Sequence, residues 1–422
     1  MSMDKNRAFE TLSRLAFERV SGTEKELEAA HLILEECKKA GVDACIEPFE
    51  ISQPKVFEAK LEMTKPCQKE FYCTGLGRSG ETPDEGLWGP LVYIRGGADE
   101  DITDVKGKIC LSTGGMSSDL RKKLVKKGAI GYITTWGGFY DDEIMKTQVP
   151  HRNATVAKDD DSNFPGFMMN LATAELLLKE KPEEVHIVLK QDAKAKGESR
   201  NVVATIEGTD LKDEVVVFSA HYDSVEFSSG AWDNGTGSIT IMELMHHYAE
   251  NKPRRTVKFV WCGSEEIGLL GSWAYCEAHK DELEKVILNV NFDMTGVLMG
   301  NDMLFSSADK SLVDRAVYMA KVDGHHLGTH TGLASSDSTS FALHDVPALS
   351  FGTMSVRGGA EIHSRRDTME HLDRDVFIGL CEFVAKYMDE IINASVNVVP
   401  RVLPKEAKDQ EEAMRKRLGF EK

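Results

Sequence analysis

Seven side chains that could bind metals or move protons lie in five short polar segments of the second half of the sequence. In chain order they are His221, Asp223, Asp233, Glu265, Glu266, Asp293 and His363. Imidazole nitrogen and carboxylate oxygen are ligands that zinc accepts, and catalytic zinc sites keep one position open for water. Hydrolysis of a peptide bond needs a metal-activated water beside a carboxylate that takes its proton. These residue types therefore favour metal-dependent hydrolysis.

The polar segments follow apolar runs that are typical of buried strands. VVVFSA ends directly before His221, TVKFVWC ends shortly before Glu265, and VILNVNF ends directly before Asp293. A further apolar run, PALSF (residues 347–351), precedes the segment that contains His363. Buried strands that alternate with helices indicate a mostly parallel α/β sheet, in which ligands bind at the carboxyl ends of the strands. We therefore expect the polar segments to meet at one edge of the sheet.

Two of the carboxylates are expected to act beside the metal ions and not on them. Two zinc ions need roughly five or six such ligands, usually with one bridging carboxylate, and two histidines and three carboxylates supply them. Glu265 is then left over as a base. Asp223 lies two residues after His221 on an extended segment, so it points to the same side and can accept the free imidazole N–H. Each residue alone is more often a surface loop, a turn or a helix start, and it is the ordered set that favours the metal site.

The motifs SAHYDS, GAWDNGTG, GSEEIGLLGS, NFDMTG and HSRRDT resemble those of the co-catalytic zinc aminopeptidase family. That family also contains glutamate carboxypeptidase-like enzymes and the non-catalytic transferrin receptor. The resemblance covers roughly residues 200–395. It implies a zinc-dependent exopeptidase fold with two zinc ions per chain, for which cobalt or manganese are alternatives. It also implies that one ion is held by His221, Asp233 and Asp293, and the other by Asp233, Glu266 and His363.

The same resemblance implies the roles of individual residues. Asp233 would bridge the two ions, and Glu265 would be the general base and acid. The peptide bond that follows Asp233 would be cis. One position departs from the family pattern, because Ile362 stands where a tyrosine often helps to stabilise the oxyanion. Arg357 and Ser336 are the candidates to replace that tyrosine.

The chain is long enough for two domains, and its texture changes between residues 85 and 195. KGKICL and KKGAIGYITT in this region resemble the protease-associated domain that is inserted in many members of the family. We therefore predict a discontinuous catalytic domain (residues 1–65 and 200–400), an inserted, smaller β-rich protease-associated-like domain (85–195) and a C-terminal tail (401–422).

The composition excludes several other classes of function. Acidic residues outnumber basic ones 69 to 51, and the net charge of -18 argues against a nucleic-acid or anionic-membrane partner. No apolar run approaches the roughly 20 residues that span a bilayer, and no signal-peptide core is seen, so we expect a cytoplasmic protein. The eight cysteines lack CxxC spacing and are predicted to be reduced and mostly buried. GLGRSG (residues 75–80) has dinucleotide-fingerprint spacing, but the ETPDEGLWGP that follows cannot form the required helix, which favours a loop.

We predict a metallo-exopeptidase, and first of all an aminopeptidase in which Glu265 activates a water bridged between two zinc ions. A carboxypeptidase or dipeptidase with the same centre is the first alternative, because the choice depends on whether acidic or basic groups meet the substrate terminus. A non-catalytic binding protein of the same fold and a one-zinc cyclotransferase are further alternatives, and the complete ligand set argues against both. The mixed-charge tail leaves a homo-oligomer open.

Overall fold

The computed structural model describes residues 3–149 and 163–420, and the chain divides into two compact units. The first comprises Met1–Ile51 and Glu198–Lys422, and the second comprises Ser52–Gly197. The second unit begins earlier than the predicted insertion, because β2 (Lys55–Lys65) pairs along its length with β10 (Glu184–Asp192). The C-terminal tail is counted within the first unit.

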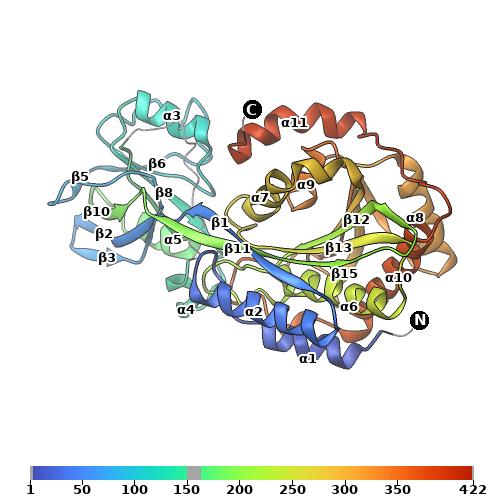
Figure 1. Cartoon of the computed structure of the whole chain (residues 1–422). Helices are drawn as coiled ribbons and strands as arrows, with labels where there is room; N and C mark the ends of the chain where they lie inside the picture. Colours follow the sequence, from blue (N-terminus) through green and yellow to red (C-terminus); the bar gives the residue numbers. More distant parts are fainter. Residues whose placement is uncertain (1–2, 150–162, 421–422) are drawn as a thin grey trace. The chain divides into compact units, whose positions relative to one another are not determined.

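The first unit is built on an eight-stranded sheet (Figure 1). Its four central strands, the third to the sixth in spatial order, are parallel, whereas the strands that flank them run antiparallel to their inner neighbours. This mixed, mostly parallel sheet confirms the predicted fold class. In spatial order the strands are β1 (Ala44–Ser52), β11 (Lys196–Ile206), β13 (Arg255–Cys262), β12 (Leu211–His221), β14 (Val286–Phe292), β17 (Ala348–Ser355), β15 (Gly300–Ser306) and β16 (Gly328–Thr331).

Helices cover both faces of this sheet (Figure 1). One face packs in a large apolar cluster against α1 (Lys5–Leu15), α2 (Glu24–Lys39), α6 (Gly237–Glu250), α8 (Lys310–Val322) and α10 (Arg374–Ile392). The other face lies under α7 (Leu270–Ala278), α9 (Ser338–Ala342) and α11 (Lys405–Leu418). Three shorter helical turns are η1 (Ala231–Thr236), η2 (Lys280–Lys285) and η3 (Met369–His371).

The central strands are apolar because both of their faces are covered. Every residue of β14 is buried, and the ring of Phe218 on β12 lies 5.6 Å from that of Phe259 on the next strand. Asn291 is a polar exception within β14, and its side chain bonds to Ser219 and to Ser350 at 2.9 and 3.0 Å. Since these buried polar groups are paired, they are compatible with the core and tie three neighbouring strands together.

The second unit contains two sheets that share one apolar core. The four-stranded sheet has the spatial order β3 (Lys69–Phe71), β2, β10 and β5 (Leu87–Gly89). The five-stranded sheet has the order β4 (Thr74–Gly75), β9 (Gly166–Asn170), β8 (Gly131–Trp136), β7 (Ile109–Leu111) and β6 (Leu91–Tyr93). The helices in the described part of this unit are α3 (Ser118–Lys126), α4 (Glu143–Thr147) and α5 (Leu171–Lys179). Residues 75–80 pass from the end of β4 into a turn that no helix follows, as predicted.

All eight cysteines are free. Six are buried, and only Cys45 and Cys67 are exposed, which confirms the prediction of mostly buried thiols. Within the described residues, no helix is both long enough and apolar enough to cross a membrane.

Candidate metal centre

The predicted ligands gather around the carboxyl ends of the parallel strands. His221 is the last residue of β12, Asp293 follows β14 directly, and Glu266 lies in the loop after β13. Asp233 lies in η1, directly before α6, and the peptide bond that follows it is cis, as the family resemblance implied. His363 lies in the loop after β17 and adopts a left-handed backbone conformation with φ of 55°.

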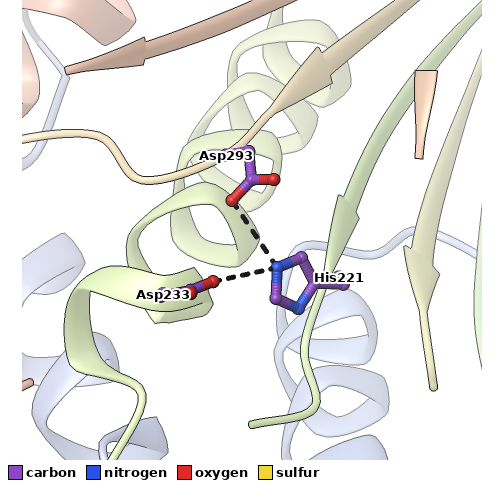
Figure 2. A group of neighbouring side chains, drawn as sticks. All are labelled: His221, Asp233 and Asp293. Carbon is purple, nitrogen blue, oxygen red and sulfur yellow. Dashed lines mark ion pairs between the residues drawn. The ribbon is translucent and has the colours of Figure 1, made fainter. Parts of the chain in front are cut away.

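The five side chains form two clusters that share one carboxylate. In the first, Nε2 of His221 lies 3.2 Å from Oδ1 of Asp233 and 3.5 Å from Oδ1 of Asp293 (Figure 2). In the second, Nε2 of His363 lies 3.1 Å from Oδ2 of Asp233 and 2.9 Å from Oε2 of Glu266. Donor atoms bound to one tetrahedral zinc ion at roughly 2.0–2.1 Å lie about 3.3 Å from one another. The spacing of both clusters suits zinc, and the two oxygens of Asp233 face different clusters.

The electrostatics of the site also suit cations. Burial raises the pKa of Glu265 and of Glu266 well above the usual range, and nearby carboxylates add to the rise. Oε1 of Glu266 and Oδ1 of Asp293 are buried and accept no hydrogen bond from any described residue. Buried carboxylates are stable when they are paired or when they coordinate a metal. Divalent ions would therefore complete this centre.

Asp223 is buried beside the centre and contacts more groups than its sequence position suggested. Oδ1 of Asp223 lies 3.5 Å from Nδ1 of His221, on the side of the ring that faces away from the clusters. The same carboxylate accepts the backbone N–H groups of Glu265 at 3.0 Å and of Glu266 at 3.3 Å. It also accepts the hydroxyl of Ser21 at 2.8 Å. One side chain thus connects the strand end that carries a ligand with the loop that carries another.

Glu265 lies beside the two clusters but belongs to neither. Its Oε2 lies 3.9 Å from Nε2 of His221, and the side chain is only 12% exposed. A carboxylate in this place can take a proton from a group held between the clusters. Two residues were candidates to stabilise the oxyanion. Ser336 is buried, and its Oγ accepts a hydrogen bond from Nδ2 of Asn291 at 2.7 Å, whereas Arg357 is exposed.

Two histidines outside the centre bond to carboxylates elsewhere in the fold. His247 bonds to Asp389 at 3.2 Å, and His279 bonds to Glu47 at 3.1 Å. Neither joins a metal-ligand group among the described residues, in agreement with a structural role.

Two buried residues at the centre were not predicted from the sequence. Arg19 follows α1 and is fully buried, and burial lowers the pKa of its guanidinium to about 10, so it stays charged at neutral pH. Asp367 lies four residues after His363 and accepts the backbone N–H of Asp233 at 3.0 Å. A carboxylate follows each ligand histidine within a few residues: Asp223 follows His221, and Asp367 follows His363. This pattern in the sequence could have identified Asp367.

A mixed α/β sheet with two imidazoles and a shared carboxylate at its carboxyl edge is an arrangement typical of metallopeptidases. Residues 201–388, somewhat less than half of the chain, match the model of peptidase family M28. This match agrees with the predicted peptidase class.

Three similar proteins extend the comparison. Aminopeptidase YwaD of Bacillus subtilis is 28% identical over 297 residues, which are 68% of this chain and 61% of the relative's own length. Carboxypeptidase Q of Xenopus laevis is 23% identical over 418 residues, 94% of this chain and 88% of that protein. The crystal structure of BSAP, a zinc aminopeptidase from Bacillus subtilis, has a TM-score of 0.78 at 24% identity, covers 94% of this chain and 97% of its own, and shares the fold.

The contacts of Asp223 lead to a first prediction. In Asp223→Asn one acceptor oxygen becomes an NH₂ group, so one of the two loop amides loses its partner. We expect zinc affinity and kcat each to fall about 10- to 100-fold, the usual effect of losing a partner of a metal ligand. Titration with a zinc chelator and steady-state kinetics measure both quantities.

The matched control is Asp309→Asn, which alters the capping carboxylate of α8. This variant is expected to keep wild-type zinc affinity and kcat. If Asp223→Asn also kept both, the role of Asp223 at the centre would be refuted.

Proposed function

We propose that this protein is a zinc-dependent aminopeptidase that removes the N-terminal residue from peptides. His221, Asp233 and Asp293 hold one zinc ion, and Asp233, Glu266 and His363 hold the other. The observation that carries this proposal is the position of Asp233, whose two oxygens lie 3.2 and 3.1 Å from the imidazoles of different clusters. A carboxylate that serves two metal ions has this arrangement.

Zinc, when bound, supplies Lewis acidity and lowers the pKa of water, so that a strong nucleophile exists at neutral pH. Glu265 acts as the general base that takes the proton of the attacking water, and as the acid that returns it to the leaving amine. Asp223 orients the imidazole of His221 and holds the backbone of Glu265. These two contacts keep the general base Glu265 and the metal ligand His221 in fixed relative positions. Burial of the centre strengthens each of these electrostatic interactions.

The similar proteins support the aminopeptidase assignment and also leave a second candidate. Aminopeptidase YwaD and the zinc aminopeptidase BSAP favour removal of an N-terminal residue. Carboxypeptidase Q, which aligns with 94% of this chain, favours a carboxypeptidase or dipeptidase with the same centre.

A panel of substrates separates these functions. An aminopeptidase is expected to hydrolyse aminoacyl amides and peptides with a blocked carboxyl terminus, but not peptides with a blocked amino terminus. A carboxypeptidase would show the reverse preference, and a dipeptidase would need both free termini. Turnover that survives complete removal of metal by a chelator would refute the metallopeptidase assignment in all its forms.

The paired clusters predict two zinc ions per chain. Elemental analysis of dialysed wild-type protein is expected to find two, and Asp293→Ala is expected to retain only the ion of the second cluster. The reason is that Asp293 belongs to one cluster, whereas Asp233 belongs to both. A wild-type protein that binds one ion or none, even after zinc is added, would contradict the two-ion centre.

The position of Glu265 outside both clusters predicts that its charge serves turnover and not metal binding. Glu265→Gln should lower kcat by at least about 10²- to 10⁴-fold, the range for general acid–base assistance, with zinc content unchanged. Glu266→Gln is the matched comparison and should instead lose zinc from the second cluster. Loss of zinc from Glu265→Gln would show that the two glutamates have exchanged roles.

We further propose that the second unit (Ser52–Gly197) is the protease-associated-like insertion, supported by its two small sheets between β1 and β11. The eight free cysteines support a reducing compartment such as the cytoplasm.

A further inference from the structure

The turn that delivers Asp233 is held from one side by the guanidinium of Arg19. This side chain is fully buried and forms no ion pair with any residue that the structure describes. It donates instead to five backbone carbonyls of three separate segments. Its acceptors are the carbonyls of Leu15 at 2.7 Å, Phe17 at 2.7 Å, Tyr222 at 2.5 Å, Ser229 at 2.6 Å and Gly230 at 3.0 Å.

The same turn is also held by the carboxylate of Asp367, which is 2% exposed. Its Oδ1 accepts the backbone N–H of Trp232 at 2.7 Å, and its Oδ2 accepts that of Asp233 at 3.0 Å. The backbone carbonyl of Asp367 also accepts the hydroxyl of Ser229. Because Asp367 lies four residues after His363, it connects the ligand loop of the second cluster to the turn.

The two side chains are matched in charge to the groups they bind. The guanidinium of Arg19 donates to the carbonyls of Ser229 and Gly230, and the carboxylate of Asp367 accepts from the backbone N–H groups of Trp232 and Asp233. Charge-assisted hydrogen bonds are stronger and geometrically more definite than neutral ones. Arg19 packs closely against the turn at Gly230. This residue has a left-handed φ of 54°, and an added Cβ would lie 2.8 Å from Nη2 of Arg19.

Arg19 also reaches the strand end of the first cluster. Its Nε donates to the carbonyl of Tyr222, the residue directly after His221. Arg19 therefore links the segment after His221 with the turn before Asp233. Neither Arg19 nor Asp367 is a metal ligand, but between them they hold the backbone beside His221, Asp233 and His363.

We propose that Arg19 and Asp367 are positioning residues that fix the carboxylate of Asp233 between the two metal ions. Displacing this carboxylate weakens both clusters together, because each uses one of its oxygens. This inference rests on the proposed two-zinc function.

The test is zinc binding, measured by competition with a chromophoric chelator, for the full-length wild type, Arg19→Gln, Arg19→Lys and Asp367→Asn. Arg19→Gln and Asp367→Asn should each lower the affinity for both zinc ions by about 10-fold or more, as is usual for residues that orient metal ligands. Arg19→Lys keeps the charge but has fewer donors, and should lie between wild type and Arg19→Gln. Asp293→Ala serves as the contrast, because it should remove one ion and spare the other.

Arg255→Gln is the matched control for a purely structural effect. Arg255 is also fully buried and donates to three carbonyls at or just after the end of α10, those of Ile391, Ile392 and Ala394; unlike Arg19 it also pairs with a carboxylate, Glu214, at 2.7 Å. It begins β13, about 23 Å along that strand from the end that faces the metal centre. This variant should lower the melting temperature but leave the affinity for both zinc ions unchanged.

The outcomes separate this inference from the proposed function. Lower affinity for both zinc ions in Arg19→Gln and Asp367→Asn, together with wild-type affinity in Arg255→Gln, supports the positioning role. Wild-type affinity in either folded variant, or loss of only one ion, overturns it while leaving the two-zinc function intact. If Arg19→Gln does not fold, Arg19→Lys and Asp367→Asn decide the question by the same criteria. A wild type that binds fewer than two zinc ions overturns the proposed function and this inference with it.

Discussion

The structure depends on the concentration of buried negative charge around two imidazole rings. Asp233, Glu266 and Asp293 point their oxygens at His221 and His363 within 3.5 Å, and divalent cations would balance these buried carboxylates. Asp233 is the central member, because each of its oxygens faces a different ring. The remaining architecture can be understood as the means of holding this carboxylate in place.

Two kinds of support hold the charged groups. The parallel strands bring His221 and Asp293 to the same edge, since each lies at the carboxyl end of a strand whose register is set by buried apolar neighbours. Polar side chains then fix the loops between strands. Asp223 accepts hydrogen bonds from backbone N–H groups of the Glu265 loop, and Arg19 donates hydrogen bonds to backbone carbonyls of the turn before Asp233. Packing sets the approximate positions, and charge-assisted hydrogen bonds set the final ones.

Much of the site could be predicted because metal ligands leave a local signature. Histidine and carboxylate side chains directly after apolar runs identify the carboxyl ends of strands, and parallel strands must bring those ends together. The five predicted ligands meet in the structure for this reason, and the mostly parallel sheet agrees with fully buried, mainly apolar strands such as β14. The family motifs added the expectation that Asp233 is shared, which strand patterning alone could not supply.

The sequence by itself determined the types of the ligands, their order and the class of fold, because these depend on residue chemistry and on periodicity along short segments. Only the tertiary structure decided which distant groups hold the ligands. Arg19 meets the Ser229 carbonyl across 210 positions of the chain, and Asp367 meets the amide of Asp233 across 134. The start of the second unit at Ser52 likewise depends on the pairing of β2 with β10. The contacts of Arg19 and Asp367 join a side chain to backbone groups that nearly all residues carry, so the sequence does not show which distant segment each side chain meets.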